Sequence, residues 1–179
     1  MCTCINFKTN DYYFGRNLDL DYNFNEKVVI TPRNYQLKNN LLVKYAIIGM
    51  ATVNDDYPLY ADAVNEYGLA MAGLYFPHNA YYNNYDAKKT NVTSYELIPF
   101  ILGNFKGIKE LKDILYTLNI TNESFNDKLP VADLHWMISD GDNCIVIEQV
   151  KSGLKVYINK VGVLTNNPEF PYHLTNLNN

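Results

Sequence analysis

The sequence of 179 residues lacks a long apolar run, a surplus of basic residues and a framework of paired cysteines. No stretch approaches the roughly 20 consecutive apolar residues that cross a membrane, and the N-terminus lacks the basic-then-apolar layout of a secretory signal. The 15 Lys and Arg residues stand against 19 Asp and Glu residues, and the net charge of -4 argues against the basic face that nucleic acid binding needs. We therefore expect a cytoplasmic protein whose partners include neither nucleic acid nor a membrane.

The three cysteines are an odd number, and Cys2 and Cys4 lie too close in sequence to suggest a disulfide framework. Free thiols in a reducing compartment are the simpler interpretation, with Cys4 and Cys144 as core side chains. No ligand-like spacing links the histidines, which are His78, His135 and His173. We expect no metal, and we expect His135 to pack in a strand.

The length and a hydrophobic content of 47% suit one globular domain over residues 1–179. Amphipathic helices are expected at 94–105 and 108–118, between two sets of strands, which predicts an α+β sandwich. A Pro168–Pro171 turn follows the final strand, without a second helical layer for the far face of the sheet. Either the helices lie on one side only, or the sequence is part of something longer. Strands are predicted at 2–7, 12–14, 27–31, 45–52, 60–64, 69–74, 134–139, 144–150, 154–158 and 161–164.

Cys2 directly after Met1 is the most informative candidate for chemistry. Removal of Met1 would leave a thiol and a free α-amino group on the same residue. Since an α-amino group has a pKa of roughly 7.7–8.0 and a thiol one of about 8.5, the amine can accept the thiol proton near neutral pH. This is the N-terminal-amine form of nucleophile activation, although a cysteine at position 2 is weak evidence when it stands alone.

Several blocks along the whole chain together resemble the choloylglycine hydrolase family, which contains conjugated bile salt hydrolases and penicillin V acylases. The resemblance runs from residue 1 to 179. The blocks are Met1-Cys2-Thr3-Cys4, Phe14-Gly15-Arg16-Asn17-Leu18-Asp19, Ile30-Thr31-Pro32-Arg33-Asn34-Tyr35, Asp62-Ala63-Val64-Asn65-Glu66, Gly68 to Leu74, His135 to Asp140 and Gly162 to Pro168.

The resemblance implies an αββα sandwich of the N-terminal-nucleophile hydrolase type that cleaves linear, non-peptide amide bonds without a metal or organic cofactor. It makes Cys2 the nucleophile, with Arg16 and Asp19 beside it. The guanidinium would favour the thiolate, and the carboxylate would hold the α-amino group. Asn166 matches the asparagine that donates to the tetrahedral oxyanion. Taken alone, Arg16 and Asp19 would suggest a surface ion pair, and Asn166 a turn residue.

Two departures from the family pattern bear on function. Tyr75, a candidate substrate-binding residue, stands where bile salt hydrolases resemble one another in having asparagine. A tyrosine there is more like the penicillin V acylases and slightly favours them, but the sequence leaves conjugated bile acids, penicillin V and acylated homoserine lactones open as substrates. Members of the family are also considerably longer, so the sandwich is expected to be incomplete in its second half. The alternative is therefore a truncated, inactive fragment that needs a separate C-terminal part. Relatives commonly form tetramers, and we expect a homo-oligomer here.

Overall fold

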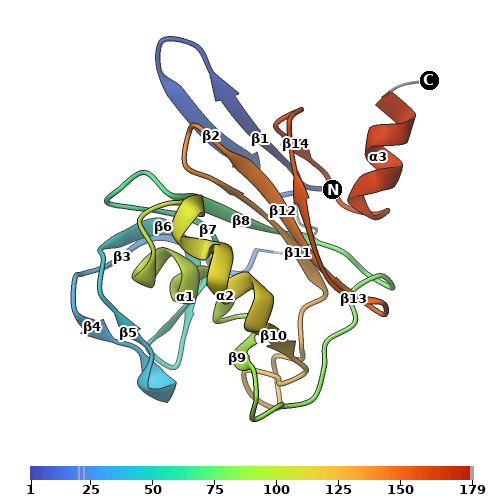
Figure 1. The fold of residues 1–179 in the computed structure, drawn as a ribbon. Coiled ribbons are helices and arrows are strands. Elements are labelled where there is room, and N and C mark those ends of the chain that lie inside the picture. Colours follow the sequence, from blue (N-terminus) through green and yellow to red (C-terminus); the bar gives the residue numbers. More distant parts are fainter. Residues whose placement is uncertain (20, 22, 178–179) are drawn as a thin grey trace.

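The computed structural model describes residues 1–19, 21 and 23–177, and it has three layers (Figure 1). Helices cover one face of a seven-stranded sheet, and a three-stranded sheet packs on the other face. All neighbouring strands of the larger sheet are antiparallel. Its order is β13 (Gly153–Ile158), β12 (Cys144–Val150), β11 (Leu134–Ser139), β8 (Ala70–Tyr75), β7 (Tyr57–Asn65), β6 (Ile47–Asn54) and β3 (Lys27–Thr31).

The smaller sheet holds the N-terminal strand in its centre. Its order is β14 (Val163–Leu164), β1 (Thr3–Lys8) and β2 (Tyr12–Asn17). A tight turn joins β1 to β2, with a hydrogen bond from the Thr9 backbone N–H to the Asp11 carbonyl at 2.9 Å. Because β1 has a partner on each side, the start of the chain is anchored by two ladders.

The helical layer consists of α1 (Leu97–Asn104), the 3-10 turn η2 (Ile108–Leu111) and α2 (Lys112–Thr117). Apolar side chains of α1 are fully buried with Trp136 and Ile138 from β11, and this cluster is the larger of two cores. Burying side chains of this size contributes roughly 1.5–3 kcal/mol each, so this core fixes the larger sheet as a platform for the smaller one.

The second core lies between the two sheets, and it contains all three cysteines with Leu164 and Phe170. Burial raises the pKa of the Cys4 thiol and of the Cys144 thiol to about 12. The prediction that these two are core thiols is confirmed. Cys2 belongs to the same core, at the end of the sheet where β1 begins.

The α+β class and its layers are as predicted, but the prediction missed one helix and several short strands, and it misplaced some element ends. The turn at 168–171 leads into a further helix, α3 (Phe170–Leu177), because Pro171 sits in the first helical turn, where proline is tolerated. The helix predicted to end at residue 118 ends at Thr117. The remaining elements are short: β4 (Tyr35–Gln36), η1 (Lys38–Asn40), β5 (Leu42–Val43), and a parallel pair formed by β9 (Thr90–Thr93) and β10 (Leu118–Thr121).

Candidate active site

Cys2 lies at the rim of the inter-sheet core, immediately before β1, and only 3% of its surface is exposed. The strand register brings Asn166 to it. Cys4 pairs with Leu164 across the β1–β14 ladder, so two residues further along the antiparallel register Cys2 meets Asn166. The Cys2 backbone N–H donates to the Asn166 Oδ1 at 2.6 Å. Two candidates that are 164 residues apart therefore share one hydrogen bond.

The Asn166 carboxamide is held at both ends. Its Oδ1 accepts from Cys2, and its Nδ2 donates to the backbone carbonyl of Tyr75 at 2.7 Å, which uses one of the two Nδ2 hydrogens. The predicted alternative of a turn residue is compatible with this geometry, because Asn166 follows β14 and precedes α3. Tyr75 ends β8, and its side chain is 56% exposed. Its carbonyl, rather than its ring, makes the described contact with Asn166.

Met1 and Thr3, the neighbours of Cys2, are held by polar side chains that follow Arg16. The Met1 amine donates to Asp19 Oδ2 at 2.7 Å, and this hydrogen bond raises the pKa of the amine. Asn17 Oδ1 accepts the Thr3 N–H at 2.6 Å, while its Nδ2 donates to the Met1 carbonyl at 3.2 Å. Asn17 thus holds the residues on both sides of Cys2. Sequence reasoning missed this role, although Asn17 lies inside the block that supplied Arg16 and Asp19.

Arg16 and Asp19 do not behave as the surface pair that the two residues alone would suggest. The Arg16 side chain is 4% exposed and its guanidinium lies 3.7 Å from the Asp62 carboxylate on β7. It also donates from Nη1 to the Ala61 carbonyl at 3.2 Å. Burial raises the pKa of Asp62, and the nearby Arg16 opposes that rise. The influence of Arg16 on the Cys2 thiol stays a prediction.

A cavity of about 280 Å³ opens between β2 and the larger sheet, with Arg16 and Asp62 in its wall. Its remaining lining is mostly apolar and comes from Tyr12, Phe14, Gly15, Ile48, Ala63, Val64, Gly68 and Ala70. Arg16 Nε is buried and has no hydrogen-bond partner among the described residues. The cavity therefore combines apolar walls with an ion pair between Arg16 and Asp62.

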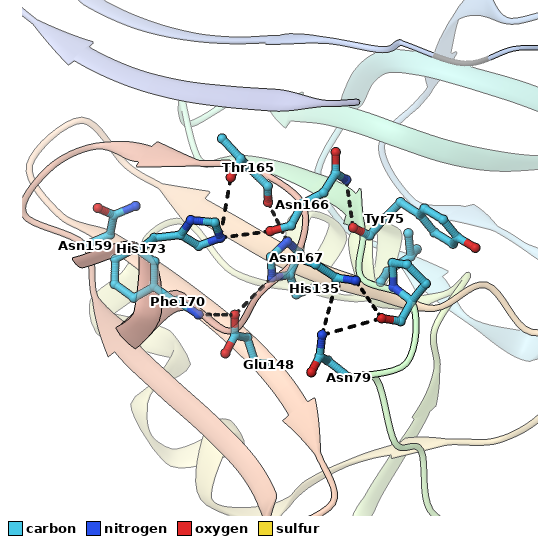
Figure 2. A network of polar contacts seen from close by, with 12 residues as sticks. Tyr75, Asn79, His135, Glu148, Asn159, Thr165, Asn166, Asn167, Phe170 and His173 are labelled. Atoms are coloured by element: carbon cyan, nitrogen blue, oxygen red, sulfur yellow. Dashed lines mark hydrogen bonds and ion pairs between the residues drawn. The ribbon is translucent and has the colours of Figure 1, made fainter. Parts of the chain in front are cut away.

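Figure 2 shows a buried polar network behind Asn166. His135 on β11 lies in a strand, as predicted, and it contacts Glu148 on β12 through Nδ1 at 3.0 Å. Its Nε2 lies 2.7 Å from the Thr165 carbonyl. His173 Nε2 lies 2.9 Å from the Asn166 carbonyl. The network joins β11, β12 and the segment from Thr165 to His173, and no single local motif could have revealed it.

Within residues 1–19, 21 and 23–177, no group of three or more His, Cys, Asp or Glu side chains could hold a metal ion. None of the helices in these residues has the length and apolar character to cross a membrane.

Comparison with known proteins places these residues in a family context. A model of the family described as linear amide C–N hydrolases, choloylglycine hydrolase family, matches residues 2–179. The bile salt hydrolase/transferase of Lactiplantibacillus plantarum is 51% identical over 183 residues, which cover all of this chain and 56% of that protein. The bile salt hydrolase/transferase of Clostridium perfringens is 43% identical, with coverage of 99% and 57%. The chain thus spans little more than half the length of these relatives.

Solved structures share the architecture. A crystal structure of a mutant conjugated bile acid hydrolase from Clostridium perfringens matches with a TM-score of 0.95 and 42% identity, over 99% of this chain and 57% of that one. The penicillin V acylase from Agrobacterium tumefaciens matches with a TM-score of 0.77 and 21% identity, over 97% of this chain and 55% of that one. At 21% identity, the match to the penicillin V acylase supports the fold alone.

Proposed function

Because this chain belongs to the choloylglycine hydrolase family of linear amide C–N hydrolases, we propose that it is an amidohydrolase whose nucleophile is the Cys2 thiol after removal of Met1. The observation that carries the proposal is the 2.6 Å hydrogen bond from the Cys2 backbone nitrogen to Asn166 Oδ1. That nitrogen becomes the α-amino group when Met1 leaves. Met1 is 89% exposed, so an aminopeptidase can reach it.

The reaction follows from the two groups on Cys2. The α-amino group takes the thiol proton, and the thiolate attacks the amide carbonyl carbon. The tetrahedral intermediate collapses as the C–N bond breaks, and the protonated amine returns its proton to the leaving nitrogen. The acyl group now forms a thioester with Cys2. Water, deprotonated by the same amine, hydrolyses the thioester, which releases the acid and restores the thiol.

The neighbouring side chains fit supporting roles in that reaction. Asn166 Oδ1 would orient the amine, and the second hydrogen on its Nδ2 would stabilise the oxyanion. The Asp19 carboxylate, which now binds the Met1 amine, would keep a negative charge near the new amino group. The buried Nε of Arg16, which has no hydrogen-bond partner among the described residues, would donate to a polar group of the substrate in the cavity that Arg16 and Asp62 both line.

We favour conjugated bile salts as the substrate class over penicillin V. The support is the 51% identity to a bile salt hydrolase/transferase, compared with 21% identity to the penicillin V acylase. Tyr75, which pointed toward the acylases in the sequence, has a largely exposed ring and makes its contact with Asn166 through the main chain. The role of the Tyr75 side chain in the choice of substrate stays a prediction.

The test combines mass spectrometry with a substrate panel. The mature chain should begin at Cys2, and it should release amine from glycine- or taurine-conjugated bile acids faster than from penicillin V or an acylated homoserine lactone. Cys2→Ser should abolish turnover without unfolding the protein. Cys4→Ala is the matched control, because it alters a buried cysteine two residues along the same strand and should retain turnover. A chain that keeps Met1 yet turns over substrate would refute the mechanism.

A second candidate is an inactive fragment that functions only with a separate polypeptide. It is favoured by apolar side chains on the outer strands of the larger sheet, where Val28 is 67%, Ile30 66% and Ile48 44% exposed. It is also favoured by an open edge of the smaller sheet, since β2 pairs only with β1 among the described residues. Turnover by the purified chain alone would reject this candidate, whereas turnover that requires an added polypeptide would support it.

A further inference from the structure

His135 and Glu148 form a buried pair to which the proposed reaction assigns no role. Both side chains have 0% exposure, and Nδ1 and Oε1 are 3.0 Å apart on the neighbouring strands β11 and β12 (Figure 2). Burying two ionisable groups carries a desolvation cost that their attraction often fails to offset, so such a pair is weak evidence for stability. Its geometry indicates another purpose.

The hydrogen positions in the pair follow from its partners. A carbonyl oxygen can only accept, so the His135 Nε2 that faces the Thr165 carbonyl at 2.7 Å must carry a proton. Glu148 Oε1 faces Nδ1 and also accepts the Phe170 backbone N–H at 2.9 Å. The Phe76 ring stacks on the imidazole at 4.2 Å with a 9° angle, which restricts rotation of the ring. The His135 ring is therefore held in one orientation, in which its Nε2–H donates to the Thr165 carbonyl.

Thr165 immediately precedes Asn166, and the next carbonyl is held in a similar way. His173 on α3 donates from Nε2 to the Asn166 carbonyl at 2.9 Å. Glu148 ties α3 to the same network through the Phe170 N–H. Two histidines thus donate hydrogen bonds to two consecutive carbonyls, those of Thr165 and Asn166 (Figure 2). The Asn166 carboxamide extends from this segment toward Cys2 and Tyr75.

We propose that His135, oriented by Glu148, is a positioning residue that sets the Asn166 carboxamide between the Cys2 nitrogen and the Tyr75 carbonyl. It acts through the Thr165 carbonyl and touches no reacting atom. The proposal rests on the proposed function, in which Asn166 orients the amine and binds the oxyanion. A misplacement of such a group by about 1 Å can cost a factor of 100 in rate, so a rigid support behind it matters.

Two substitutions of His135 distinguish the roles of its two ring nitrogens. A glutamine amide places its nitrogen near the position of Nε2, and an asparagine amide places its nitrogen near that of Nδ1. His135→Gln can therefore keep the donor to Thr165, whereas His135→Asn loses it. Both are made together with Glu148→Gln, so that no buried carboxylate is left without a partner, and the Glu148→Gln single variant is the reference.

Turnover by the full chain is the first measurement. Relative to Glu148→Gln, the His135→Asn double variant should lose about tenfold or more in kcat with little change in KM, and the His135→Gln double variant should stay within about threefold. Ser139→Ala is the matched control, because Ser139 is buried on the same strand β11 as His135 and donates to the Asn143 carbonyl at 2.8 Å, away from Thr165. It should lower the Tm while leaving kcat unchanged.

The second measurement is hydrogen exchange of the Asn166 side-chain amide by NMR, which does not depend on turnover of substrate. In the native chain and in the His135→Gln double variant, the Nδ2 hydrogen that is donated to the Tyr75 carbonyl should exchange slowly with solvent. In the His135→Asn double variant the exchange of this hydrogen should accelerate by about tenfold or more. If the native chain shows no turnover but the exchange pattern holds, the proposed function fails while the positioning role stands.

Other results overturn the proposal. Equal kcat losses in the asparagine and glutamine double variants, or equal exchange rates of the Asn166 amide in both, would show that the pair only supports the core. If a double variant does not fold, the imidazole ¹⁵N spectrum of the native chain decides. A proton on Nε2 of His135 supports the proposal, and a ring protonated on Nδ1 alone refutes it.

Discussion

The Asn166 side chain links two parts of the candidate site, because it is hydrogen-bonded both to Cys2 and to Tyr75 at the end of β8. Asn166→Ala removes an acceptor for the amine and a donor for the oxyanion, so we expect kcat to fall by about 100-fold or more. Asn167→Ala is the matched control, because Asn167 is the next residue and donates to the Pro77 carbonyl at 2.7 Å. Steady-state kinetics of both variants checks this, and equal losses would contradict it.

Asp62 offers a prediction about pH. Burial raises its pKa above the unfolded value of 3.8, and Arg16 opposes that rise. The folded state therefore holds the Asp62 proton more tightly than the unfolded state. The stability that this tighter proton binding contributes is present at low pH, and it is lost as the pH rises through the pKa of Asp62 in the folded state. Arg16→Met removes the opposing charge, so the pKa of Asp62 rises further and the loss extends toward neutral pH.

We expect Arg16→Met to lower the free energy of unfolding by about 3 kcal/mol at pH 7 and by clearly less at pH 4. Urea denaturation at both pH values measures the difference. Adding Asp62→Asn in the same chain removes the titrating group, so the pH dependence caused by Arg16→Met should disappear. If it persists in the double variant, Asp62 is not the group responsible.

At the scale of elements, the turn before β14 decides whether Asn166 reaches Cys2. Gly162 has a φ of +73°, and an added Cβ would collide with the Asn6 carbonyl oxygen on β1. Gly162→Ala combines a strained backbone with this collision, and we expect it to cost about 3 kcal/mol or more and to reduce turnover. Gly153→Ala is the control, because its φ is +107° with open space around the new Cβ. Thermal unfolding compares the two, and a similar loss in both would show that the collision is relieved.

Most elements could be predicted from the sequence because their patterns are local. The predicted strand bounds at 27–31, 134–139 and 144–150 agree with β3, β11 and β12, whose apolar runs have clear ends. The strands β9 and β10 were missed because their polar residues, such as Asn91 and Asn119, look like loop residues. These two asparagines are in fact joined by a side-chain hydrogen bond at 2.8 Å.

The site divides in the same way between local blocks and distant contacts. Cys2, Asp19 and Asn166 could be named because each lies in a block that resembles the family. The buried partner of Arg16 could not be named, because Asp62 lies on another strand 46 residues away and meets it only after the two sheets have packed. The same holds for Asn166 and the support behind it. Sequence reasoning found the groups proposed for chemistry and missed the groups that hold them in place.

At the scale of the whole molecule, the two sheets differ in width, and this difference predicts association. The three-stranded sheet is too narrow to cover the whole face of the seven-stranded sheet. Val28 and Ile30 on the edge strand β3 therefore remain about two-thirds exposed, on the same face as Ile48 of β6. Covering each such side chain is worth roughly 1.5–3 kcal/mol, which favours burial against a second copy or another polypeptide. We therefore expect the purified chain to self-associate in a concentration-dependent way.

Sedimentation velocity of a charged variant tests where this association occurs. Val28→Lys with Ile30→Lys places two like charges on the uncovered face, and it should shift the protein toward the monomer without lowering its Tm. Tyr116→Lys with Leu177→Lys is the control, because these side chains are 80% and 66% exposed on α2 and α3. Since both pairs add the same charge, only the position of the lysines differs between them. A monomeric native chain, or equal dissociation by both pairs, would mean that the uncovered face of β3 and β6 does not drive association.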